Sequence, residues 1–143
     1  MESRIEAAAE LFKSGYNCAQ AVFVTYADLF GIGREQALRL SSSFGGGIGG
    51  MREVCGTVTG MSMIVGLYNG MTQAGDKEGK KANYDLVQLL ADRFKEENGS
   101  IICKQLLGLT PGLPSGKCKK PCVEYVRTCA RLIEEHLMPR IIT

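Results

Sequence analysis

The sequence lacks several features that would assign it to a common functional class. It has no tryptophan and a single histidine, His136, close to the end of the chain. A hydrolase built on a Cys–His pair is therefore not expected. Its 17 basic and 15 acidic residues leave a net charge of +2, so the charge balance does not point to nucleic acid as a partner.

Long hydrophobic runs are also missing. The most apolar stretch, VTGMSMIVGLYNGM at residues 58–71, is too short and too polar to span a membrane. The first residues, MESRIEAAAELF, are charged and lack the apolar centre of a signal peptide. We therefore expect no membrane span and a cytoplasmic protein.

The alternation of apolar and polar residues that a sheet requires does not occur either, whereas helical spacing is frequent. We predict an all-α, compact single-domain helical bundle of about five to seven helices over residues 1–143. Expected helices cover residues 2–13, 18–30 after an Asn17 cap, 34–41, 54–67, 77–97, 101–107 and 121–136. A loop of prolines and glycines should separate the last two, at residues 108–117.

What the chain does have is cysteine and glycine. The six cysteines are Cys18, Cys55, Cys103, Cys118, Cys122 and Cys129. In a reducing compartment, so many thiols are better explained as metal ligands or redox groups than as a disulfide scaffold. There is no C-x-x-C pair, which excludes a zinc ribbon or a thioredoxin motif by sequence, and no C-x-x-C-H, so covalent haem is not expected.

Four of these cysteines share one kind of position. Cys18, Cys55, Cys103 and Cys122 each lie at the predicted start of a different helix. The helix dipole stabilises negative charge there, so we expect these thiols to ionise readily into the thiolates that act as nucleophiles and metal ligands. Cys129, two turns into the last helix, is expected to pack in the core.

Cys118 has three open interpretations. It lies in or just after the loop, beside Lys117, Lys119 and Lys120. It could be a fifth ligand, a resolving thiol or a surface cysteine.

Glycine is concentrated before Cys55. The run GGGIGG at residues 45–50 satisfies G-x-G-x-x-G, but no strand precedes it and no P-loop lysine follows it. Nucleotide binding is not expected. We interpret the run sterically, as a tight bend that brings Cys55 near other segments, and expect Gly56 and Gly60 to let another helix pack closely.

Together these segments resemble a known family. The motifs GYNCAQAV (15–22), FGGGIGG followed by CGTVTG (44–60), Cys103 and CVEYV (122–126) are similar to the redox-active C_GCAxxG_C_C family, named for its cysteine pattern. Its signature cysteines would fall on Cys18, Cys55, Cys103 and Cys122, and Thr57 departs from the usual alanine. The resemblance implies a redox-linked role. A related domain in the split-Soret type of cytochrome c, which carries an iron–sulfur cluster, implies that such a cluster could occur here without haem.

The leading hypothesis is that Cys18, Cys55, Cys103 and Cys122 converge to bind an iron–sulfur cluster or another thiophilic metal, with Cys118 as a further candidate ligand. Electron transfer or redox sensing would be the function, with a redox protein as partner; a homodimer is left open. One alternative is metal-free thiol–disulfide chemistry, in which the same four thiols are catalytic. Another is a structural zinc or partner-binding module. Whether the protein is an enzyme is left undecided.

Overall fold

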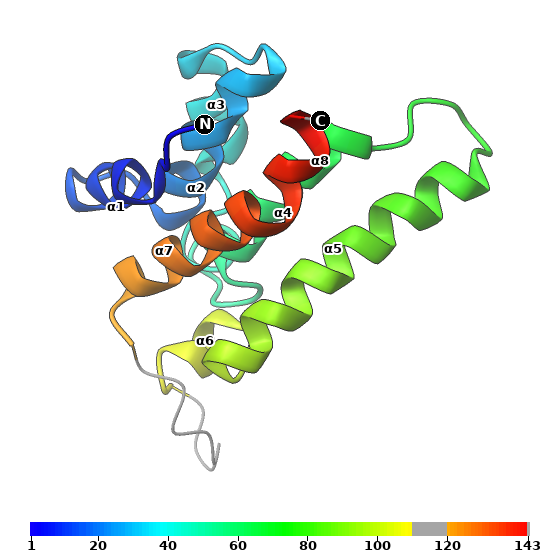
Figure 1. Ribbon diagram of the computed structural model, residues 1–143. Coiled ribbons are helices and arrows are strands. Elements are labelled where there is room, and N and C mark those ends of the chain that lie inside the picture. The colour runs from blue at the N-terminus through cyan, green and yellow to red at the C-terminus, as the bar shows by residue number, and fades with distance from the viewer. Residues whose placement is uncertain (110–119, 143) are drawn as a thin grey trace.

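Helices form where the helical spacing predicted them. The structure is a computed structural model that describes residues 1–109 and 120–142 (Figure 1). The all-α prediction is confirmed: in the described residues the helices are α1 (Ile5–Lys13), α2 (Cys18–Ala27), η1 (Asp28–Phe30), α3 (Arg34–Ser42), α4 (Gly56–Asn69), α5 (Lys77–Asn98), α6 (Cys103–Leu106), α7 (Cys122–Leu132), η2 (Ile133–Leu137) and α8 (Met138–Ile142). The predicted loop at residues 108–117 lies almost wholly outside the described part.

The last three elements continue one another without a break. The π-helical turn η2 joins α7 to α8, and Ile133 and Met138 both keep right-handed helical backbone angles. Helical structure therefore continues beyond residue 136, where we had predicted its end. Counting this rod as one helix, the described chain has seven α-helices, within the predicted number.

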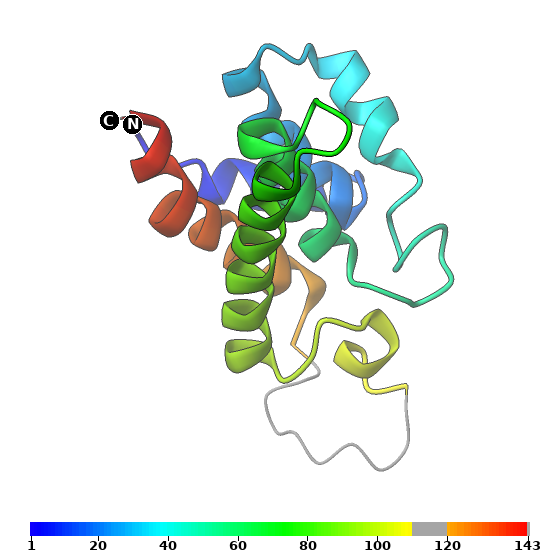
Figure 2. The ribbon, with the colours of Figure 1, turned by 90° about the vertical axis from the view of Figure 1, so that its right-hand side faces the viewer.

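Helix α2 is the centre of the bundle. It packs against α1, α3, α4 and α7, and eight of its ten residues are buried. The sequence CAQAVFVTYA is accordingly apolar on nearly every side, as expected for a helix surrounded by others. Helix α5 lies along α4 and α7 and closes the bundle on another side (Figure 2).

Close packing of α2 on α4 depends on glycine, as predicted. A β-carbon built on Gly60 would lie 2.9 Å from the carbonyl oxygen of Ala19, and one on Gly56 would lie 3.2 Å from the amide nitrogen of Ala19. Any larger residue would force the two helices apart. The glycines thus bring the N-terminal ends of α2 and α4 together.

The described residues contain no β-strand, but one short extended contact determines where two helices begin. Val54 and Ile102 form an isolated antiparallel bridge. Because residues 54 and 101–102 belong to this extended contact, α4 starts at Gly56 and α6 at Cys103, each two residues later than predicted. None of the helices described combines the length and apolar character needed to cross a bilayer.

Candidate functional site

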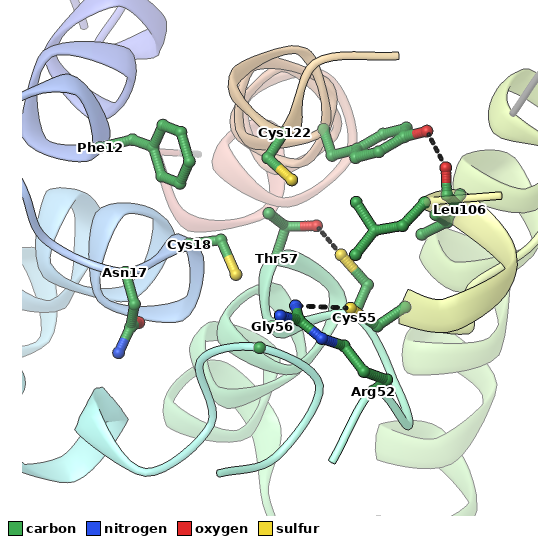
Figure 3. A pocket seen from close by; sticks show the side chains of 13 residues that line it. Phe12, Asn17, Cys18, Arg52, Cys55, Gly56, Thr57, Leu106 and Cys122 are labelled. Carbon is green, nitrogen blue, oxygen red and sulfur yellow. Dashed lines mark hydrogen bonds between the residues drawn. The ribbon is translucent and has the colours of Figure 1, made fainter. Parts of the chain in front are cut away.

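Four cysteines line one cavity. It has a volume of about 220 Å³ and lies where α2, α4, α6 and α7 begin (Figure 3). Cys18, Cys103 and Cys122 are the first residues of α2, α6 and α7, and Cys55 is the N-cap of α4, so the prediction that each of the four lies at the start of a helix is confirmed. The structure therefore brings together four residues that are widely separated in the sequence.

Backbone hydrogen bonds join the segment that carries Cys55 to the segment that carries Cys103. The amide of Cys55 donates to the carbonyl of Ile101 (2.8 Å), and the amide of Cys103 donates to the carbonyl of Glu53 (2.6 Å). These bonds flank the bridge between residues 54 and 102 and hold the two cysteines on neighbouring segments. Both side chains are buried, with 6% and 8% of their surface exposed.

Cys18 rests against the start of α4. A β-carbon on Gly56 would lie 2.6 Å from its Sγ, so the sulfur occupies the space that a side chain at residue 56 would need. Asn17 fixes the preceding turn: its side chain accepts from the amide of Gln20 (2.9 Å) while that of Gln20 accepts from the amide of Asn17 (3.1 Å). This capping box confirms the predicted cap and orients Cys18.

Cys122 is positioned by a tyrosine one turn further along α7. The hydroxyl of Tyr125 donates to the carbonyl of Leu106 (3.1 Å), which links α7 to α6. The Tyr125 ring also packs against Phe94 of α5, with ring centroids 5.8 Å apart. Cys122 and Cys18 are partly exposed, and their sulfur atoms point into the space between the helices (Figure 3).

These four thiols share the cavity without forming a closed ligand group. Among residues 1–109 and 120–142, no three histidine, cysteine or acidic side chains lie close enough together to hold a single metal ion. The five cysteines in the described residues are free thiols. Cys118, the remaining candidate, falls outside the described residues.

The expectation that the helix starts make these thiols acidic is wrong for two of them. Burial raises the pKa of Cys55 to about 12, and the hydrogen bond between its thiol and the hydroxyl of Thr57 only partly offsets this. Burial also raises the pKa of Cys122, and the neighbouring Cys18 and Cys103 raise it further. Loss of water around these thiols outweighs the helix dipole.

Two hydrogen-bond partners of the cavity sulfurs were not predicted from the sequence. The hydroxyl of Thr57, which is fully buried, lies 3.0 Å from the Sγ of Cys55, and a hydrogen bond links them. Nη1 of Arg52 donates to the Sγ of Cys103 over 3.7 Å. The departure from alanine at residue 57 was the available signal for the first; nothing in the local sequence of Arg52 indicated the second.

The glycine run has the steric role that we predicted. Gly46, Gly47, Gly49 and Gly50 all have positive φ, and Gly46 itself lines the cavity. A β-carbon on Gly47 would lie 2.6 Å from the amide nitrogen of Glu53, so the run folds back closely on the segment that leads to Cys55.

Cys129 does not line the cavity. It packs in the core with no exposed surface, as predicted, and burial raises its pKa well above the ordinary value.

Comparison with known proteins identifies the family. The family model described as "Putative redox-active protein (C_GCAxxG_C_C)" matches residues 16–136, well over half of the chain. No curated protein and no solved structure matches the chain. The matched region contains the cavity cysteines and the helices that begin with them. The chain therefore belongs to the redox-active C_GCAxxG_C_C family.

Proposed function

We propose that this protein uses Cys18, Cys55, Cys103 and Cys122 to hold an iron–sulfur cluster for electron transfer or redox sensing. The observation that carries the proposal is the cavity of about 220 Å³ lined by these four cysteines, each from the start of a different helix. Four cysteine thiolates are the usual ligand set of both [2Fe–2S] and [4Fe–4S] clusters.

The donor set, four cysteine thiols around one cavity, suits such a cluster. The thiols surround a common space, yet no three of them in the described chain are close enough for one ion. A cluster contains several iron atoms, so its ligands can stand further apart than those of a single zinc ion. When bound, it would supply a centre that gains and loses one electron.

The surroundings of the thiols suit a buried redox centre. Phe12, Leu106, Leu107 and Tyr125 give part of the cavity an apolar wall. The Sγ of Cys55 shares a hydrogen bond with the hydroxyl of Thr57, and the Sγ of Cys103 accepts one from Arg52. Low solvent exposure and hydrogen bonds to sulfur are two of the means by which proteins set the potential of such a centre.

Anaerobic purification, reconstitution with iron and sulfide, and a visible spectrum test the proposal. We expect broad visible absorption with iron and acid-labile sulfide in proportion to protein. A colourless protein that binds stoichiometric zinc would instead support the structural module. Absence of metal, with a thiol count that falls by two on oxidation, would support thiol–disulfide chemistry.

Single substitutions define the ligands. Cys18→Ser, Cys55→Ser, Cys103→Ser and Cys122→Ser should each lower the iron and sulfide content strongly. Cys129→Ala is the matched control, since this cysteine is buried and does not line the cavity; it should retain the cluster. Cys118→Ser separates a fifth ligand, which would change the spectrum, from a surface cysteine, which would not.

A further inference from the structure

We propose that Arg52 is the residue that stabilises negative charge in the cysteine cavity. Of the cavity-lining residues that the structure describes, Arg52 is the one with a charged side chain, and none is an aspartate or glutamate. Its Nη1 donates to the Sγ of Cys103 over 3.7 Å. A dashed line in Figure 3 marks this hydrogen bond at the guanidinium of Arg52.

The backbone of Arg52 is held firmly beside Cys103. Its amide donates to the carbonyl of Gly46 (2.9 Å), and its carbonyl accepts from the amide of Lys104 (3.1 Å). The residue has a φ of +64°, which is unusual for a side chain other than glycine. Such a conformation persists where the surrounding structure enforces it, and here it aims the guanidinium at the cavity.

The glycine run borders this side chain. A β-carbon on Gly46 would lie 3.7 Å from Nη1 of Arg52. The described chain shows no ion pair of Arg52 with a carboxylate, whereas the adjacent Glu53 pairs with Lys104 at 3.8 Å. Within the described residues, the guanidinium of Arg52 thus contacts the Cys103 sulfur and has no carboxylate partner. It also acts on Cys122: burial raises the pKa of this thiol, and the charge of Arg52 lowers it.

Thiolates and their clusters are anionic, and adding an electron makes them more so. A guanidinium next to one of the sulfurs favours the more negative state. Arg52 would therefore raise the reduction potential of the centre. This consequence rests on the proposed function, but the field of Arg52 in the cavity can be measured without any cluster.

The cluster-free test compares two alkylating reagents on the metal-free protein. In both, the thiolate sulfur attacks the methylene carbon, a C–S bond forms and iodide leaves. Iodoacetate is anionic and iodoacetamide is neutral, so the ratio of their rates at one cysteine cancels its thiolate fraction. It reports the electrostatic attraction of an anion into the cavity.

We expect the iodoacetate-to-iodoacetamide ratio at Cys103 to fall roughly three- to tenfold in Arg52→Gln, as judged by mass spectrometry of each cysteine. Arg52→Lys should keep most of the ratio. Arg93→Gln, on the exposed face of α5, is the control for net charge and should behave as the wild type. An unchanged ratio in Arg52→Gln, or an equal fall in Arg93→Gln, would overturn the proposal.

The second test uses the reconstituted protein and titrates it with dithionite. Arg52→Gln should make reduction less favourable by roughly three- to tenfold in the equilibrium constant, where tenfold corresponds to about 59 mV for one electron. An equal or more positive midpoint potential in Arg52→Gln would contradict the role of Arg52. Failure of the wild type and of every variant to bind a cluster would refute the proposed function, and the alkylation ratio would still decide on Arg52.

Discussion

At the scale of single residues, Gly56 determines whether Cys18 can reach the cavity. A β-carbon at residue 56 would lie 2.6 Å from the Sγ of Cys18 and 2.8 Å from the carbonyl oxygen of Phe44. The sulfur could rotate away from such an atom, but the backbone carbonyl could not move cheaply. Glycine is therefore required at residue 56, because α2 and Phe44, which directly precedes the glycine run, both approach α4 closely.

Gly56→Ala should lower the free energy of unfolding by about 1–3 kcal/mol, because an extra methyl group is forced into a filled space. It should also reduce cluster content, since Cys18 is displaced. Gly66→Ala is the matched control in the same helix: nothing lies within 4 Å of its β-carbon position. That variant should be neutral or more stable by roughly 0.5–1 kcal/mol. Urea unfolding that ranks the two variants equally would contradict this account.

A second prediction for a single residue concerns the hydroxyl of Thr57. Its buried hydroxyl is bonded to the Sγ of Cys55, and valine has the same shape without the hydroxyl. Thr57→Val should lower the unfolding free energy of the metal-free protein by about 1 kcal/mol, the usual value of one buried hydrogen bond. If urea unfolding finds Thr57→Val as stable as the wild type, this hydrogen bond does not contribute to stability.

At the scale of elements, the site is made from helix starts, and local sequence determines most of them. Asn17 and Gln20 form the capping box of α2, and Pro121 precedes α7; both signals are readable in the sequence. The starts of α4 and α6 were misplaced because they depend on the bridge between Val54 and Ile102. Residues so far apart in the chain carry no local mark of their pairing.

Asn17 tests how much a cap contributes to the site. It caps α2, and its Nδ2 also donates to the carbonyl of Ser42 (2.9 Å), which ties α2 to the end of α3. Asn17→Ala should lower the unfolding free energy by about 1 kcal/mol. Asn17→Ser keeps a capping oxygen but loses the reach to Ser42, so thermal unfolding should place it between alanine and the wild type. A serine variant no more stable than the alanine variant would show that capping contributes little.

At the scale of the whole molecule, burial of thiols makes stability depend on pH. Burial raises the pKa of Cys55 to about 12 and that of Cys129 well above its ordinary value. In the unfolded chain a cysteine loses its proton near pH 8.5. Above that pH the unfolded state binds fewer protons than the folded state, so the unfolding free energy falls as pH rises toward the folded pKa.

Cys129→Ala checks the sign and size of this effect in the metal-free protein. Between pH 9 and 10 each such thiol should contribute a loss of about 1.4 kcal/mol per pH unit. The slope of stability against pH should therefore be shallower by about that amount in the variant, whatever its overall stability. Urea unfolding at several pH values measures the slope, and equal slopes would show that Cys129 ionises as readily folded as unfolded.

The sequence predicted the all-α fold and named four cysteines that the fold brings to one cavity, because helix periodicity and caps are local properties. It did not predict the burial that raises the pKa of Cys55 and Cys122, since burial depends on the packing of all the helices. It also missed Arg52, whose contact with Cys103 joins residues 51 positions apart. The electrostatics of the site are a property of the assembled molecule.

The proposal on which the rest depends is that the four cavity cysteines jointly ligate one iron–sulfur cluster. X-ray absorption at the iron edge of the anaerobically reconstituted protein tests it most directly. The account predicts iron surrounded by sulfur alone, with a neighbouring iron in the next shell, and loss of this signal in Cys55→Ser. Iron bound through nitrogen or oxygen with no iron neighbour, or no bound iron at all, would contradict it.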